Sequence, residues 1–135
     1  MSAFRIQLDV RWGDLDAFNH VGNVTYLRYV EECRAAWLNS VPSHWRDDEA
    51  GPVIANIHLN YRRPLGWPAR IDVSLKPHSP GRSSIRLDHE IHSLAADGTR
   101  EELHADGTTV IVWIDKNKGE PVPLPRVLRE LAAKG

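Results

Sequence analysis

Five segments of alternating apolar and polar residues accompany a single long helical pattern, and this arrangement constrains the fold more than any other feature of the sequence. A period of two is typical of β-strands that bury one face. Turn-forming Pro, Gly, Asn and Asp residues separate the last four segments, so we expect those strands to pair antiparallel. The predicted strands span residues 4–11, 53–62, 70–76, 85–92 and 100–114.

The long helix is predicted over residues 24–38, where apolar residues recur with a helical period. Arg34 projects inside the apolar arc, and Glu31 lies at its edge three residues earlier. Two interpretations stay open for Arg34: a partly buried ion pair with Glu31, or a stem that covers apolar surface while its charge reaches water. The apolar face comprises Tyr26, Leu27, Tyr29, Val30, Cys33, Trp37 and Leu38.

These elements predict an α+β fold in which a curved antiparallel five-stranded sheet wraps around one central helix. The remaining segments are a loop at 39–52, long enough to be a flap with a helical turn at 43–50, and a short terminal helix at 125–134.

One helix cannot shield a whole sheet. The last strand is apolar on both faces at 110–114, and Trp113 is expected to point away from the helix, which predicts a second copy of the chain against the sheet.

Length and composition are those of an ordinary globular protein with one domain. The 135 residues fit a single domain over residues 1–135. A net charge of −1 argues against nucleic acid or an anionic membrane as a partner. The N-terminus lacks a signal-peptide pattern, and no apolar run approaches the roughly 18 residues of a membrane span, so we expect a cytoplasmic protein. The one cysteine, Cys33, excludes an intramolecular disulfide.

The candidate site is the polar loop between the first strand and the helix. It holds the carboxylates of Asp14 and Asp16, the imidazole of His20 and the amides of Asn19 and Asn23. The loop delivers these groups to a helix N-terminus, where unpaired backbone N–H groups and the helix dipole favour negative charge. A site that holds an oxyanion and moves a proton could be built from these parts.

One long motif runs through this loop into the helix: Trp12-Gly13-Asp14-x-Asp16-Ala17-Phe18-x-His20-Val21-x-Asn23-x-x-Tyr26-Leu27-Arg28-Tyr29-x-Glu31-Glu32-x-Arg34. A second segment, Asn60-Tyr61-Arg62-Arg63-Pro64-Leu65, follows the second predicted strand. Together they resemble the 4-hydroxybenzoyl-CoA thioesterase-like group of hotdog-fold acyl-CoA thioesterases. That family often reads Gly-His-Val-Asn-Asn where this chain has Asn19-His20-Val21-Gly22-Asn23, so a glycine and an asparagine are exchanged and the flexible residue follows the histidine.

The resemblance implies a hotdog fold, an acyl-CoA substrate, hydrolysis of its thioester without a cofactor or metal, and a homodimer or homotetramer. It makes Asp16 the catalytic carboxylate, acting as general base or as nucleophile. Backbone amides from Gly22 to Val24 would receive the oxyanion, with Asn19 and Tyr26 beside the substrate. The phosphates of coenzyme A need cations, for which the candidates are Arg62, Arg63, Lys76 and Arg82.

Several of these residues also have structural interpretations. Asp14 is interpreted as a loop carboxylate bound to turn amides, Asn23 as the helix N-cap and Tyr26 as a core residue. His20 either orients Asp16 or the substrate carbonyl, or is a half-buried structural histidine. An aromatic or short-chain acyl pocket could be lined by Trp12, Phe18, Trp37, Trp45 and Trp67.

Three other functions remain open from the sequence. A dehydratase acting on hydroxyacyl thioesters could use His20 with Asp16 as an acid–base pair. A non-catalytic acyl-CoA-binding module could use the same scaffold. Asp14, Asp16 and His20 could instead hold a divalent metal, although their spacing matches no strong metal motif.

Overall fold

The protein is described by a computed structural model that covers residues 3–42 and 49–133. Strand β1 is followed by a short 3-10 turn (η1), the long helix α1, strands β2 to β5 and the terminal helix α2. Their bounds are β1 Phe4–Asp9, η1 Trp12–Asp14, α1 Asn23–Ser40, β2 Ala50–Tyr61, β3 Arg70–His78, β4 Ser84–Leu94, β5 Arg100–Asp115 and α2 Arg126–Ala133. The predicted strands and helices are thus confirmed with shifts of a few residues at their ends.

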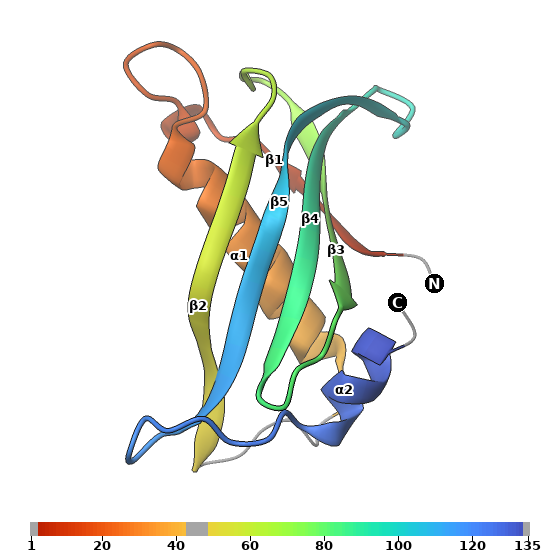
Figure 1. Cartoon of the computed structure of the whole chain (residues 1–135). Coiled ribbons are helices and arrows are strands. Elements are labelled where there is room, and N and C mark those ends of the chain that lie inside the picture. The colour runs from red at the N-terminus through yellow and green to blue at the C-terminus, as the bar shows by residue number, and fades with distance from the viewer. Residues whose placement is uncertain (1–2, 43–48, 134–135) are drawn as a thin grey trace.

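The five strands form one antiparallel sheet in the order β1-β3-β4-β5-β2. Figure 1 shows the sheet curving in front of α1, with α2 packed at its lower end. Because β1 and β2 are the opposite edges of the sheet, the α1 segment that connects them must cross its inner face. The predicted α+β fold with a curved sheet around a central helix is confirmed. The predicted turn at 43–50 and Trp45 concern mainly residues 43–48, which lie outside the described residues, and Ala50 already belongs to β2.

The core lies between α1 and the inner face of the sheet. The helix buries Tyr29, Val30 and Cys33, each at most 1% exposed, against strands that present one face inward. Leu27 is only half-buried, so the buried stripe is slightly narrower than predicted. Complete burial of an aliphatic side chain such as Val30 contributes about 1.5–3 kcal/mol relative to exposure. The buried strand residues include Ile71, Val73 and Leu75 of β3, Ile85, Leu87 and Ile91 of β4, and Ala105 and Ile111 of β5.

The prediction that Trp113 points away from the helix is wrong. Trp113 is 1% exposed and belongs to the core together with Ile111. The chain itself covers this end of β5, because the segment after β5 folds back: Val122 donates its N–H to the Trp113 carbonyl at 2.9 Å, and Leu124 and Leu128 are buried. Burial of Trp113 therefore needs no second copy of the chain.

Among residues 3–42 and 49–133, strand β2 is a second surface that stays partly exposed. Helix α1 packs mainly against β3 and β1, which lie toward the edge of the sheet opposite β2. As a result β2 leaves Val53, Ile54, Ile57 and Tyr61 between 39% and 46% exposed along a sheet edge. A long apolar edge strand is an unusual surface for a protein that remains monomeric.

Two polar side chains are buried beneath α1. Arg34 reaches Glu31 at 3.7 Å, with its side chain 11% exposed and that of Glu31 70% exposed, so the predicted ion pair is present but only its arginine is buried. The alternative in which the charge reaches water is wrong, because Nη1 is buried and has no hydrogen-bond partner among the described residues. His89, on the inner face of β4, pairs its Nε2 with the Thr109 hydroxyl at 2.9 Å. Burial, assisted by the nearby charge of Arg34, lowers the pKa of His89 to about 4.

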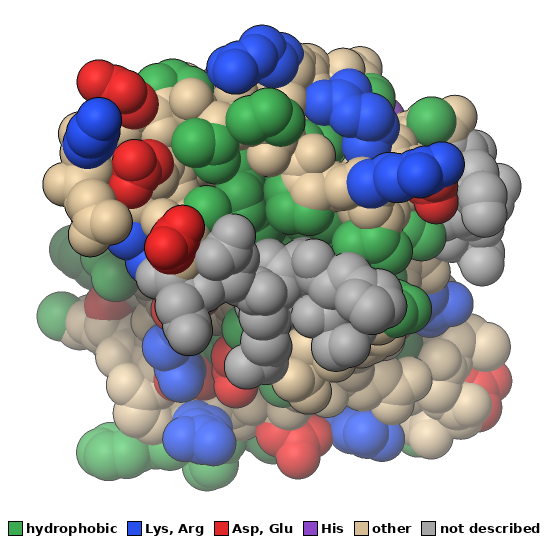
Figure 2. Space-filling view, turned by 90° about the horizontal axis from the view of Figure 1, so that it is seen from below, with side chains coloured by type: hydrophobic (Ala, Val, Ile, Leu, Met, Phe, Trp, Pro, Cys, Tyr) green, Lys and Arg blue, Asp and Glu red, His purple; other side chains and the backbone are tan. Residues whose placement is uncertain are grey.

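The length and hydropathy of the helices bear on whether the chain could cross a membrane. Within residues 3–42 and 49–133, no helix is both long and apolar enough to cross a bilayer. Figure 2 shows the end of the molecule that carries α2, where basic and acidic side chains both occur around an area of hydrophobic side chains.

The buried His89 predicts a loss of stability in acid. Its pKa in the folded state lies below the 6.5 of an unfolded chain, so protons bind preferentially to the unfolded state as the pH falls from 6.5 toward 4. The total effect is about 3 kcal/mol, of which about 2 kcal/mol is lost by pH 5. Urea denaturation at pH 7 and pH 5 should show this loss in the wild type and a smaller one in His89→Gln, which keeps a polar partner for Thr109. Equal losses in the two proteins would contradict a neutral buried His89.

Candidate active site

The loop between η1 and α1 folds into a small closed hairpin. The Asp16 amide donates to the His20 carbonyl at 2.8 Å, and the Asn19 amide donates to the Asp16 carbonyl at 3.1 Å. Leu15 and Val21 form an isolated antiparallel bridge just inside this turn. The turn therefore exposes the side chains of Asp16 and His20 at the end of the molecule where α1 begins.

The exchanged asparagine and glycine have different backbone conformations. Asn19 has a φ of +63°, in the left-handed region that glycine adopts freely and asparagine tolerates better than most residues. Gly22 has a φ of −67° and a ψ of 150°, which any residue can adopt. A Cβ added to Gly22 would meet the Asp16 Cβ at 3.8 Å, an ordinary contact. The left-handed turn before His20 thus exists in this loop although the glycine has moved behind it.

Helix α1 begins one residue earlier than predicted, so the interpretation of Asn23 as N-cap is wrong. Gly22 is the N-cap and Asn23 is the first helical residue, because the Gly22 carbonyl accepts the Thr25 amide at 2.9 Å. A glycine has no side chain to cap the helix. The Gly22 amide is already bound to the Asp14 carbonyl at 3.1 Å. The first-turn amides of Asn23 and Val24, which have no acceptor within the helix, are the donors left for an anion.

Asp14 is buried, unlike Asp16, and its carboxylate is fully engaged. Oδ1 accepts from Arg28 at 2.7 Å, and Oδ2 accepts from the Tyr29 hydroxyl at 2.6 Å and the Arg11 amide at 2.9 Å. Burial acts to raise the pKa of Asp14, but the bonds from Tyr29 and Arg11 and the charge of Arg28 outweigh it, so the pKa lies below its ordinary value. The predicted contact with a turn amide is present, whereas both contacts with the helix were missed.

A cavity of about 300 Å³ opens between this loop and the end of β2. It brings together most of the residues that the sequence predicted for the site. The lining comes from three parts of the chain, namely the loop that carries Asp16 and His20, the start of α1, and the end of β2 with the turn after it. The lining residues are Asp16, Phe18, His20, Val21, Asn23, Tyr26, Tyr61, Arg62, Arg63 and Pro64.

Two tyrosines form one wall of the cavity. Tyr26 is 3% exposed and stacks edge-on against Tyr61, with ring centroids 5.1 Å apart. The Tyr61 hydroxyl donates to the Asn23 carbonyl at 3.4 Å, which links β2 to the start of the helix. Burial raises the pKa of the Tyr26 hydroxyl, so it stays protonated at neutral pH. Tyr26 is therefore both a core residue and a cavity residue. Tyr61 was not predicted for the site, because the alternating pattern assigned it only to the apolar face of its strand.

The turn after β2 is held firmly against the loop. The Val21 amide donates to the Leu65 carbonyl at 2.8 Å, and the buried His104 pairs its Nδ1 with the Pro64 carbonyl at 3.1 Å. No sequence pattern pointed to His104, because it contacts the turn from the neighbouring strand. These bonds fix the wall of the cavity that carries Arg62 and Arg63.

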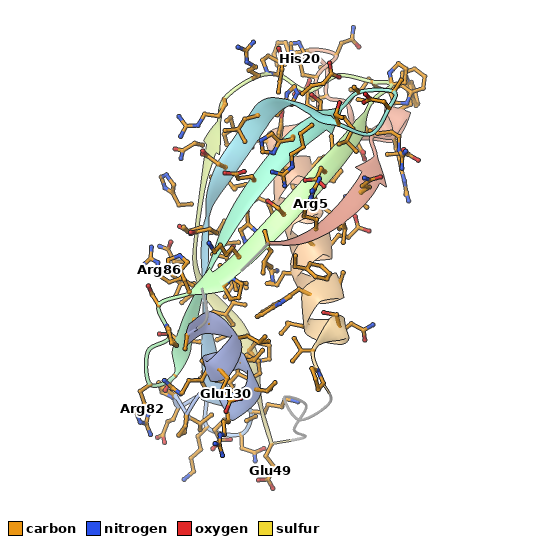
Figure 3. All side chains as sticks on the ribbon, turned by 90° about the vertical axis from the view of Figure 1, so that its right-hand side faces the viewer. Arg5, His20, Glu49, Arg82, Arg86 and Glu130 are labelled. Carbon is orange, nitrogen blue, oxygen red and sulfur yellow. The ribbon has the colours of Figure 1, made fainter. Side chains whose placement is uncertain are left out.

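The four predicted cations fall into two groups. Arg62 pairs with Asp106 at 3.1 Å, and Arg63 lies 3.5 Å from Glu102, both at the cavity. Lys76 lines a separate cavity beside the end of α2. Figure 3 shows Arg82 at the opposite end of the molecule from His20. Within one protomer the structure therefore brings Arg62 and Arg63 to the candidate site and leaves Lys76 and Arg82 away from it.

The predicted aromatic lining is reduced to one residue among those described. Phe18 lies at the cavity and is 81% exposed, whereas Trp37 is buried in the core. Trp12 and Trp67 are exposed outside the cavity lining.

The alternative of a metal site finds no support in the arrangement of these side chains. Asp14 is not grouped with Asp16 and His20, and residues 3–42 and 49–133 hold no group of three His, Cys, Asp or Glu side chains arranged to bind a metal ion.

Comparison with known proteins points in one direction. Residues 10–131 match the family model described as the thioesterase-like superfamily. The chain is 31% identical to the long-chain acyl-CoA thioesterase FadM of Escherichia coli over 127 residues, which is 92% of each chain. A thioesterase from Thermus thermophilus, solved in complex with coenzyme A and Zn, is 31% identical with a TM-score of 0.76 and 94% of each chain covered. The PA2801 protein of Pseudomonas aeruginosa is 28% identical with a TM-score of 0.84, covering 96% of this chain and 98% of its own.

The left-handed conformation of Asn19 generates a stability prediction. Asn19→Gly should leave the free energy of unfolding nearly unchanged, because glycine adopts a positive φ without strain. Asn19→Ala should lower it by about 1 kcal/mol, since a Cβ is disfavoured there and alanine lacks the asparagine amide. Urea denaturation of the three proteins measures both changes. An alanine variant as stable as the glycine variant would show that the loop does not need this conformation.

Proposed function

The chain belongs to the thioesterase-like superfamily, and from this membership we propose that it is an acyl-CoA thioesterase that hydrolyses an acyl- or aroyl-CoA to the free acid and coenzyme A. The observation that carries the proposal is the cavity in which Asp16, His20, the start of α1 and two arginines meet. The named activity of the relatives supports it, since they include an acyl-CoA thioesterase and a thioesterase bound to coenzyme A.

Asp16 is the proposed catalytic carboxylate. A thiolate leaving group has a parent pKa of about 8.5, so it departs without strong help from a general acid. What the site must supply is a nucleophile and a place for negative charge. Asp16 either removes a proton from the attacking water or attacks the carbonyl carbon itself, giving a mixed anhydride that water then hydrolyses. Its exposed side chain is open to substrate, and its Oδ1 is held by the Phe18 amide at 2.8 Å.

The first turn of α1 is the proposed oxyanion site. The amides of Asn23 and Val24 lack helical acceptors, and the 18-residue helix directs its dipole toward them. Well-placed donors of this kind are worth about 3–4 kcal/mol each in a transition state. Gly22 contributes by backbone geometry rather than by its amide, which Asp14 occupies. His20, at the same cavity, would orient Asp16 or the substrate carbonyl.

Arg62 and Arg63 are the proposed contacts for the phosphates of coenzyme A. Both lie at the mouth of the cavity, and their side chains are 51% and 62% exposed. The acyl group would lie against Tyr26, Tyr61 and Phe18. Lys76 and Arg82 lie away from this cavity, so a role for them in binding coenzyme A requires a neighbouring subunit.

The uncovered strand β2 supports the proposed homo-oligomer. Its exposed apolar residues lie along a sheet edge whose last residue, Tyr61, also lines the cavity. A second copy that pairs with this edge would bury Val53, Ile54 and Ile57 and would close the cavity. We expect a homodimer, or a homotetramer built from such dimers, with β2 at the interface.

Replacing Asp16 tests the chemistry. Asp16→Asn should lower kcat at least about 100-fold, because the amide can neither accept a proton nor attack a carbonyl. Release of thiol from short, long, branched and aromatic acyl-CoAs measures the loss and also defines the acyl specificity. Asp9→Asn, an exposed carboxylate on β1, is the control and should keep full activity, with the circular dichroism of both variants unchanged.

An Asp16→Asn variant with wild-type turnover would refute the proposed mechanism. Hydration of an enoyl-CoA, or dehydration of a 3-hydroxyacyl-CoA, in place of thiol release would assign the site to a dehydratase. Thermal stabilisation by acyl-CoAs without turnover of any of them would assign the protein to non-catalytic binding.

Replacing Arg63 tests where the nucleotide binds. Arg63→Gln should raise KM for an acyl-CoA about three- to tenfold while kcat stays within twofold, because it removes one charged contact with phosphate. The corresponding acyl-pantetheine, which lacks the nucleotide phosphates, should show no change in KM. Arg126→Gln, which removes an exposed arginine of α2, is the matched control and should leave KM unchanged. A similar rise in KM for both substrates would place Arg63 at the acyl or pantetheine portion instead.

A further inference from the structure

Asp14 connects three parts of the chain whose relative positions matter for the proposed chemistry. Its carboxylate binds the Arg11 amide at the start of the loop and the Arg28 and Tyr29 side chains in the second turn of α1. Its carbonyl accepts the Gly22 amide at the end of the loop. One buried residue, 8% exposed, therefore ties the beginning of the loop, its end and the helix together.

The two helix residues that hold Asp14 differ in exposure. Tyr29 is 1% exposed, so its hydroxyl has Asp14 as a partner in a site that water hardly reaches. The Arg28 side chain is 45% exposed, and its guanidinium carbon lies 5.8 Å from the centre of the Tyr29 ring. Asp14 also raises the pKa of Tyr29 beyond the effect of burial, so this hydroxyl remains a donor across the working pH range.

Asp14 is followed two residues later by Asp16, and the Gly22 that it binds is followed directly by Asn23 and Val24. The carboxylate and the amides proposed to act on the substrate are therefore attached, through short stretches of backbone, to atoms that Asp14 holds. Asp16 itself is exposed, and the hydrogen bond that its side chain accepts comes from within its own turn. Contacts within that turn cannot set its distance from the helix.

We propose that Asp14, Arg28 and Tyr29 are positioning residues, which fix the Asp16 carboxylate relative to the first-turn amides of α1 and thereby set kcat without touching the substrate. This inference rests on the proposed thioesterase function. A displacement of a catalytic group by about 1 Å can lower the rate about 100-fold. Binding of coenzyme A through Arg62 and Arg63 does not depend on Asp14, Arg28 and Tyr29.

The test is steady-state kinetics of Tyr29→Phe and Arg28→Gln. Tyr29→Phe keeps the buried ring and removes only the hydroxyl donor. Each variant should lower kcat about 10- to 100-fold, with KM within about twofold and the shape of the pH–rate profile unchanged. Arg28→Lys should restore part of the kcat lost in Arg28→Gln. The double variant should lose less than the product of the single losses, because both act through Asp14.

A matched control separates positioning from stability. Ile91→Val removes one methylene from the core of β4, outside the site, and should lower the melting temperature while keeping kcat at a temperature well below unfolding. If Tyr29→Phe is destabilised to a similar degree and also keeps kcat, the three residues are structural only and the proposal is overturned.

Two further outcomes would overturn the proposal, and one result concerns the function itself. A rise in KM with unchanged kcat would place the triad in substrate binding, and a shifted acidic limb of the pH–rate profile in Tyr29→Phe would make Asp14 itself the base. Absence of thioester hydrolysis by the wild type would instead refute the proposed function. Because the positioning test compares variants with an active wild type, the two failures are distinguishable.

Discussion

One long helix of 18 residues, with the short α2 at one end, has to cover the inner face of a five-stranded sheet, and this limited apolar cover organises the molecule. Helix α1 lies over β3 and β1, the short segment after β5 covers Trp113, and strand β2 is left with exposed apolar side chains. The candidate site occupies the boundary between covered and uncovered sheet. There the start of the helix and the end of β2 both line the cavity.

At this boundary the two aspartates of one short motif have opposite environments. Asp14 is buried and its carboxylate is saturated by Arg28, Tyr29 and a backbone amide, whereas Asp16 is exposed and held only by its own turn. A carboxylate bound to several donors is a poor proton acceptor, since each donor stabilises its charged form. The loop therefore separates the tasks of holding and reacting between two residues of identical chemistry.

Much of this arrangement follows from local sequence. Alternation predicted the strands to within a few residues because one buried face imposes a period of two, and the loop's polar residues identified Asp16 and His20 as neighbours of a helix start. Contacts made by folding back escaped the same reasoning: Trp113 is covered by the segment around Val122, and His104 supports the turn at Pro64 from another strand. Tyr29 was assigned correctly to the core, but a helical period describes only which way a side chain faces, so its bond to Asp14 could not be inferred.

The order of strands also determines how the site comes into being. Strands β3, β4 and β5 are neighbours joined by short turns, whereas β1 and β2 reach β3 and β5 only after long intervening segments have been ordered. Loop-closure entropy makes pairings distant in sequence the slow ones. Loop closure therefore favours the central meander as the folding nucleus, and both edges are expected to join it later. Since the Asp16 loop follows one edge and Tyr61 ends the other, the two halves of the cavity are expected to meet late in folding.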